Sequence, residues 1–66
     1  MTREECEKQI TGLLKQVLSV ANQYDHNIDY LDMFITRTSN GDRRIMFNNN
    51  YWDRDKKIEY SEIIPE

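Results

Sequence analysis

The chain contains one cysteine, one histidine, one proline and two glycines among its 66 residues. A single cysteine cannot form a disulfide within the chain, and Cys6 with His26 cannot supply the four ligands of a structural zinc site. No run approaches the ~18 apolar residues that a membrane span needs. We therefore expect no metal, no cofactor and no membrane contact. The lone thiol and the lack of a secretory signal predict a cytoplasmic location.

The scarcity of glycine and proline excludes collagen-like and low-complexity chains. The composition, 38% hydrophobic and 32% charged, is that of a globular protein with a modest core. The length predicts a single domain over residues 1–66. Domains of this size often depend on disulfides, a metal or a partner chain for stability. Because the first two are excluded, we expect oligomerisation or binding to a partner.

Residues 3–24 have the spacing of an amphipathic helix. Apolar side chains recur at three- and four-residue steps, and they are Cys6, Ile10, Leu13, Leu14, Val17, Leu18, Ala21 and Tyr24. Thr2 followed by Glu5 is typical of a capping box at the start of a helix. We expect this stripe, including Cys6, to be buried, and the polar face, including Gln16, to be exposed.

Two strands are predicted over residues 30–38 and 43–48, joined by a hairpin turn at Asn40-Gly41. A two-residue loop would divide the apolar side chains between the two faces of the sheet. A three-residue loop with Gly41 in the left-handed conformation places them on one face, and they are Leu31, Met33, Ile35, Ile45 and Phe47. We therefore predict the three-residue loop, which leaves Arg37 near Arg43.

A third short strand is predicted where Ile58 and Tyr60 alternate with Glu59. The predicted fold class is α+β, with one N-terminal amphipathic helix packed on a three-stranded antiparallel β-meander. In this arrangement we expect Leu14 and Val17 to face Ile35 and Phe47 across the interface between the helix and the sheet.

One helix can cover only one face of the sheet, so the opposite face needs another cover. That face carries Tyr30, Phe34 and Met46. Three large apolar side chains on an exposed surface usually mark an interaction site. We predict a dimer face here, or the contact with another partner; the alternative is that Ile63 and Ile64 fold back over it.

Charge is unevenly distributed along the chain. Residues 37–57 contain six basic and three acidic side chains, whereas residues 1–36 and 58–66 are each net acidic. The basic middle segment is the one electrostatic indication of an anionic partner. The excess is small, and we favour the interpretation that this segment is a solvated hairpin with mixed charge.

The candidate catalytic and metal-binding residues do not form a convincing set. Residues 25–29 resemble the start of a calcium loop, but Tyr30 stands where that loop needs glycine and Thr36 where it needs glutamate. Turn formation explains these residues better. His26 has no nucleophile placed near it in the sequence, and we expect little room for a pocket of ~300 Å³. We predict no enzyme activity and no catalytic residue.

Aromatic and basic side chains occur together in the second half of the chain, and they are Arg43, Arg44, Tyr51, Trp52 and Arg54. Such residues can stack bases and hold phosphates, and they also dominate protein interfaces. A third interpretation, which we favour for Tyr51 and Trp52, is that they cap the open end of the core.

Two stretches resemble a family of small uncharacterised proteins from prophages and integrative elements of low-GC Gram-positive bacteria. They are the opening Met1-Thr2-Arg3-Glu4-Glu5-Cys6-Glu7-Lys8 and the run Phe47-Asn48-Asn49-Asn50-Tyr51-Trp52-Asp53-Arg54-Asp55. The hairpin from Thr36 to Arg44 is longer than in that family. The resemblance implies a mobile-element origin and no functional residues.

The sequence therefore predicts a non-enzymatic protein-interaction module encoded by a mobile element. Given that origin, the partner could be a host defence or regulatory protein that the module inhibits. The alternative is a small nucleic-acid-binding accessory protein that uses the basic hairpin with Tyr51 and Trp52.

Overall fold

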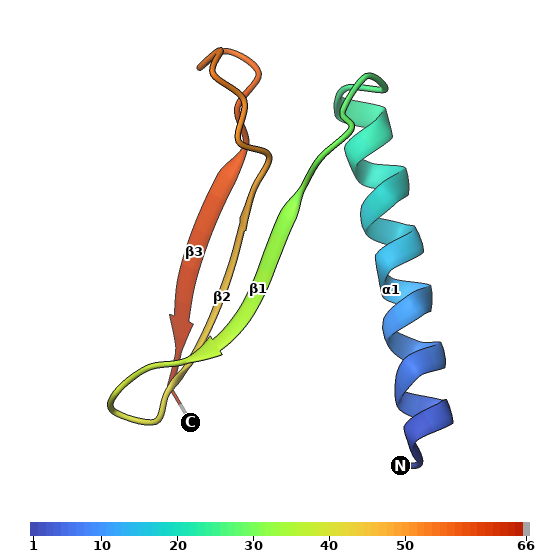
Figure 1. Cartoon of the computed structure of the whole chain (residues 1–66), viewed down its shortest axis with the longest axis vertical. Coiled ribbons are helices and arrows are strands. Elements are labelled where there is room, and N and C mark those ends of the chain that lie inside the picture. Colours follow the sequence, from blue (N-terminus) through green and yellow to red (C-terminus); the bar gives the residue numbers. More distant parts are fainter. Residues whose placement is uncertain (66) are drawn as a thin grey trace.

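A computed structural model describes residues 1–65 of the chain. One N-terminal helix is followed by a three-stranded antiparallel sheet in the order β1-β2-β3 (Figure 1). The elements are α1 (Arg3–Tyr24), β1 (Asp32–Arg37), β2 (Arg43–Asn48) and β3 (Glu59–Ile64). The predicted α+β fold class is confirmed.

Hydrogen bonds define both ends of α1, through a side chain at the N-terminus and through the backbone at the C-terminus. The Thr2 hydroxyl accepts a hydrogen bond from the Glu5 backbone N–H at 3.1 Å, as the predicted capping box requires. At the other end, the Asp25 backbone N–H donates to the Ala21 carbonyl. The Asp25 carboxylate then accepts from the Asn27 N–H at 3.0 Å. These bonds explain the polar residues after the helix as a turn.

The β1–β2 hairpin has the predicted register. Arg37 pairs with Arg43, Ile35 with Ile45 and Met33 with Phe47, so the predicted apolar side chains share one face. Gly41 adopts a φ of 89°, a left-handed conformation that glycine reaches without steric cost. We call the face with Met33 and Phe47 the inner face, and the face with Phe34 and Met46 the outer face.

The third strand is longer than the sequence indicated. Ile63 and Ile64 continue β3, where they pair with Arg44 and Arg43 of β2. The alternative in which they fold back over the outer face is therefore wrong. Backbone pairing with β2 places the two isoleucines on opposite faces of the sheet.

A hydrogen-bonded loop joins β2 to β3, and Asn49 organises it. The Asn49 side chain is 2% exposed. Its Oδ1 accepts from the backbone N–H groups of Ile58 and Tyr51, and its Nδ2 donates to the Lys56 carbonyl. Asn50 follows with a φ of 59°, a conformation that asparagine tolerates better than most residues. One buried amide thus joins the two sides of the loop.

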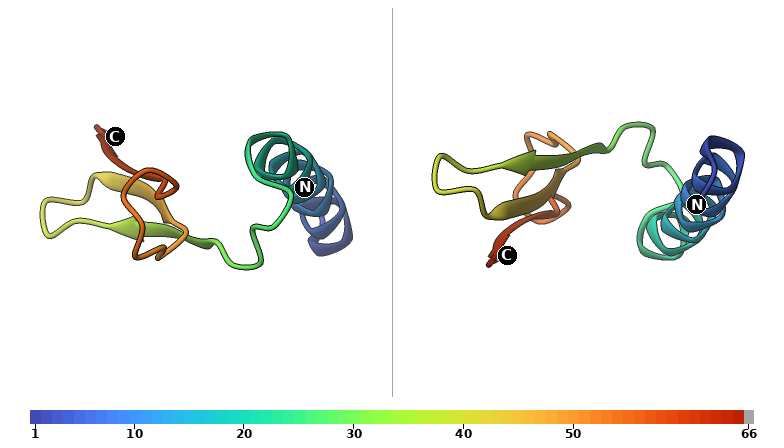
Figure 2. Two further views of the ribbon diagram at one scale, coloured as in Figure 1. Left: turned by 90° about the horizontal axis from the view of Figure 1, so that it is seen from above. Right: turned by 90° about the horizontal axis from the view of Figure 1, so that it is seen from below.

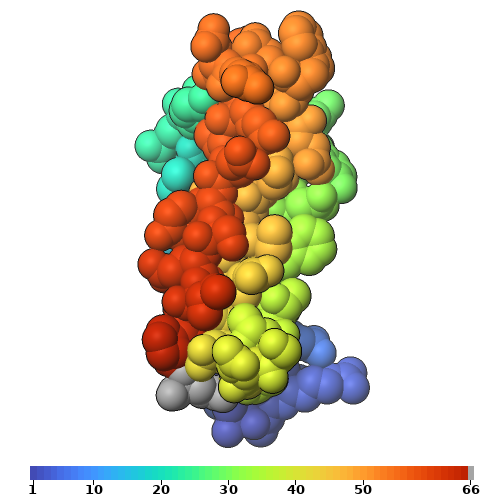
Figure 3. All heavy atoms as spheres, turned by 90° about the vertical axis from the view of Figure 1, so that its left-hand side faces the viewer, coloured from blue at the N-terminus to red at the C-terminus, as the bar shows by residue number. Residues whose placement is uncertain are grey.

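The helix lies over the inner face of the sheet but stands away from it. Figure 2 shows the two elements joined by the connection over residues 25–31, and Figure 3 shows the outer face with the helix behind it. No Cα atom of α1 lies within 8 Å of a Cα atom of any described strand. The radius of gyration is 14.1 Å, whereas a compact chain of this length has about 10.8 Å.

This separation leaves most apolar side chains exposed. Among the described residues, Ala21 is the only apolar side chain that is buried, with 8% exposed. Val17 and Phe47 line the same groove between α1 and the sheet. Ile35 is 75% exposed and lines neither groove between α1 and the sheet, so the prediction that Leu14 and Val17 face it is wrong.

We predict that Asn49→Ala lowers the free energy of unfolding by about 2 kcal/mol, because it leaves buried backbone groups without partners. At equal protein concentration, the melting temperature should fall by roughly 8–16 °C. Asn22→Ala is the control, since Asn22 is exposed on the helix and alanine is a better helix former. A melting temperature within two degrees or so of the wild type for Asn49→Ala would contradict the role given to this amide.

Candidate functional site

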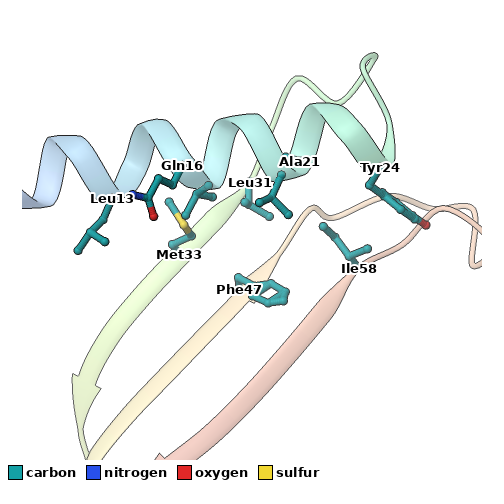
Figure 4. A pocket seen from close by; sticks show the side chains of 10 residues that line it. Leu13, Gln16, Ala21, Tyr24, Leu31, Met33, Phe47 and Ile58 are labelled. Carbon is teal, nitrogen blue, oxygen red and sulfur yellow. The ribbon is translucent and has the colours of Figure 1, made fainter.

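The gap between α1 and the inner face is an apolar groove of about 600 Å³, which we call the wedge (Figure 4). The helix contributes Leu13, Gln16, Val17, Val20, Ala21 and Tyr24, and the rest of the chain contributes Leu31, Met33, Phe47 and Ile58. In Figure 4 the labelled side chains from the helix and from the strands point toward one another. The wedge is therefore lined from both sides by apolar side chains.

The wedge is closed at one end and open at the other. At the closed end, buried Ala21 lies near half-buried Ile58, and the Tyr24 hydroxyl donates a hydrogen bond to the Asp55 carbonyl at 3.3 Å. Toward the N-terminus of α1 and the hairpin tip, the two elements diverge (Figure 1). Leu13, nearer to this open end, is 59% exposed. Val20 and Tyr24, nearer to the closed end, are 66% and 53% exposed, so apolar surface is exposed along the whole wedge.

The chemistry of the wedge suits binding rather than catalysis. Its volume of about 600 Å³ shows that the expectation of little room for a pocket of ~300 Å³ was wrong. No Asp, Glu, Lys, Arg, His or Cys side chain lines it, and the Tyr24 phenol is its one titratable group. General acid–base or nucleophilic catalysis needs such groups next to the substrate. The wedge can therefore hold apolar surface, and it offers no catalytic constellation.

Two wedge residues differ from the sequence-based expectation. Gln16, assigned to the polar face, lines the wedge, and so does Val20, which was not part of the predicted stripe. Val20 lies three residues after Val17 and four before Tyr24, so the helical spacing could have identified it. Cys6, expected in the core, is exposed.

A second, smaller groove of about 340 Å³ lies alongside the wedge. Leu14 and Leu18 of the helix line it, together with Ile28, Tyr30 and Leu31 from the connection to β1. Val17, Ala21, Leu31 and Met33 belong to both grooves. The exposed apolar surface therefore continues around both sides of α1.

The predicted dimer face is only partly apolar. Phe34 pairs with Met46 across β1 and β2, and Phe34 is 47% exposed. The Tyr30 hydroxyl donates to the Asp32 carboxylate at 2.6 Å, and this hydrogen bond raises the pKa of the Tyr30 phenol. The polar positions on this face are Asp32, Thr36, Arg44, Asn48, Glu59 and Ser61, and the face carries one further apolar side chain, Ile63, which pairs with Arg44 and is 49% exposed. The outer face thus offers a small apolar island within a polar surface.

The loop between β2 and β3 gathers part of the predicted aromatic and basic site. Tyr51, Trp52, Arg54 and Lys57 line a shallow hollow of about 520 Å³, with Glu59 at its edge. Trp52 is 93% exposed, so the interpretation of this side chain as a cap on the core is wrong. Trp52 lies in a loop, where no helix or strand periodicity predicts from the sequence which way a side chain points.

Arg43 and Arg44 lie at the other end of the sheet. They open β2 beside the hairpin turn, whereas Trp52 and Arg54 follow the last residue of β2, Asn48, in the loop before β3. A strand of this length separates its ends by roughly 17 Å. The five predicted residues therefore do not form one site.

Candidate metal ligands do not converge either. Among residues 1–65, no three His, Cys, Asp or Glu side chains are placed to hold a metal ion together. Asp25, taken from the calcium-like stretch, uses its carboxylate to fix the turn after α1. None of the described helices combines the length and the apolarity that crossing a membrane requires.

Comparisons with known proteins find no matching family model, no matching curated protein and no matching solved structure. The resemblance to mobile-element proteins therefore stays a prediction.

We predict that the loop hollow binds single-stranded DNA no more tightly than the non-specific range of ~10⁻⁴ to 10⁻⁶ M at physiological salt. Trp52 is the only tryptophan, so its fluorescence reports binding directly. Arg54→Ala should weaken any binding and flatten its salt dependence, whereas Arg43→Ala, at the far end of the sheet, should leave the Trp52 signal unchanged. Sequence-specific nanomolar binding would contradict this prediction.

Proposed function

We propose that this chain is a non-enzymatic protein-interaction module that binds its partner through the wedge. The observation that carries the proposal is the wedge itself, where apolar side chains of α1 and of the inner face oppose each other without filling the space between them. Contact between water and this apolar surface is unfavourable, because burying apolar area stabilises a protein or a complex by roughly 25 cal/mol per Å². A partner that fills the wedge removes that cost.

The composition of the wedge favours a protein as the partner. The centres of protein interfaces are depleted in charged residues and enriched in aromatic residues and methionine. Tyr24, Met33 and Phe47 fit this pattern, and no charged side chain interrupts it. The backbones of α1 and of the strands diverge toward the N-terminus of the helix (Figure 1), and we expect this end to admit a secondary-structure element of a partner.

The proposed setting rests on the sequence. The single cysteine supports action in the reducing cytoplasm. The resemblance of residues 1–8 and 47–55 to mobile-element proteins supports an origin in a prophage or integrative element. Inhibition of a host defence or regulatory protein is the role that such an origin suggests.

Nucleic-acid binding is the second candidate, and the exposed Trp52 is the observation that favours it. Trp52 and Tyr51 offer surfaces on which bases can stack, with Arg54 and Lys57 beside them for phosphates. The separation of this group from Arg43 and Arg44 leaves a small basic patch on a chain of net charge −3. We therefore rank this function below protein binding.

Site-specific photo-crosslinking tests the proposed function. A benzophenone amino acid replaces Leu13 in the wedge or, as the control, Thr11, which lies about 200° further around the helix. Leu13 is exposed enough to accept the larger ring. In cells that naturally make the protein, we expect a discrete protein adduct from position 13 and none from position 11.

A second substitution shows whether the adduct depends on the wedge. Val20→Glu places a carboxylate among the apolar side chains and should abolish the adduct formed from position 13. The same adduct from both positions, or an adduct that persists in Val20→Glu, would show that the wedge does not bind a protein.

A further inference from the structure

We infer that the partner in the wedge is a second copy of this chain, so that two chains complete one apolar core between them. This inference rests on the proposed function, because it names the protein that occupies the same groove. Three observations support it: the excess of exposed surface, the absence of charge in the wedge, and the shape of the gap.

The exposed area matches what a stable homodimer buries. The chain has an accessible surface of 5893 Å², whereas a compact monomer of 8.0 kDa exposes about 4,450 Å². The excess is about 1,440 Å² for each chain, or about 2,900 Å² for a pair. Obligate homodimers bury 2,000–5,000 Å², and transient complexes bury less.

The composition of the wedge supports the same class of complex. Interfaces of obligate homodimers resemble a domain core that has been cut in half. Gln16 is the only wedge residue that is neither aliphatic, aromatic nor methionine. The chain buries one apolar side chain, Ala21, among its described residues. The side chains that would form its core therefore already line the surface that a second copy would cover.

The shape of the gap explains how two copies fit. Each copy has a groove that is closed near Tyr24 and open toward the N-terminus of α1. In a two-fold symmetric dimer, both chains use the same patch. The exposed N-terminal half of one helix can then enter the open end of the other wedge while its own wedge receives the partner's helix. Ile10 and Leu14, both largely exposed in one chain, become buried in this arrangement.

The wedge rather than the outer face is the interface that we propose. The outer face carries Phe34, Met46 and Ile63 among charged and polar side chains, whereas no charged side chain lines the wedge. Covering the outer face would leave the apolar surface between α1 and the sheet in contact with water. The predicted role of Tyr30, Phe34 and Met46 as a dimer face is therefore the competing arrangement in the test.

Analytical ultracentrifugation of the purified chain tests the inference. At micromolar concentration the wild type should sediment with twice the mass of one chain, and its melting temperature should rise with protein concentration. Leu13→Glu should raise the dimer dissociation constant by roughly 100-fold or more, because each dimer loses two buried leucines. Thr11→Glu, on the far side of the helix, and Phe34→Asp, on the outer face, should leave the dimer intact.

A crosslinking measurement covers the case in which Leu13→Glu does not fold. The benzophenone at position 13 should give a dimer of the purified chain, and the one at position 11 should not. A wild type that stays monomeric, with a melting temperature independent of concentration, would overturn the inference. So would a dimer that Phe34→Asp dissociates, or a monomer that native mass spectrometry finds with an apolar small molecule bound.

The two proposals fail in different ways. If the purified chain is monomeric but position 13 still forms an adduct with another protein in cells, the wedge binds a different partner and only the homodimer is wrong. If neither experiment gives an adduct from position 13, the wedge is not a protein-binding surface and both proposals are wrong.

Discussion

The helix α1 is attached to the sheet at one end and not at the other, and the other properties of this structure follow from that arrangement. Ala21 and Tyr24 hold the C-terminal turn of the helix close to the loop and to Ile58, whereas the preceding turns diverge from the strands. Two amphipathic elements that normally bury each other therefore keep their apolar faces open. Burial of apolar surface is the dominant favourable contribution to folding, and one chain alone leaves most of that surface unburied.

Polar interactions fix the closed end. The buried Asn49 amide bonds to three backbone groups of the loop, and the Asp25 carboxylate fixes the turn after the helix. These local bonds specify where the helix leaves the sheet without burying apolar area. A groove that is held in shape before binding loses less conformational entropy when a partner enters it. The hydrogen-bonded end of the wedge and its exposed apolar side chains are thus both compatible with a binding surface.

Local pattern predicted the elements, and it could not predict the distance between them. The helical spacing and the Thr2 cap predicted the bounds of α1, and the need to place the apolar side chains of both strands on one face predicted the hairpin register. Periodicity identifies which side chains favour burial, but it does not say whether the same chain buries them, so the exposure of Leu13 and Ile35 was missed. Trp52 and Asn49 lie outside regular elements, where hydrogen bonds rather than periodicity fix the conformation.

Isotope-filtered nuclear Overhauser spectroscopy on a mixture of labelled and unlabelled chains tests the central claim most directly. The account places the Leu13 methyl groups across an unfilled groove from the inner face of their own sheet, and against the wedge of a second chain. It therefore predicts intermolecular signals between Leu13 of one chain and the wedge side chains of the other. Signals from Leu13 to Ile35 and Phe47 within one monomeric chain would show that the helix closes onto its own sheet, and would contradict the account.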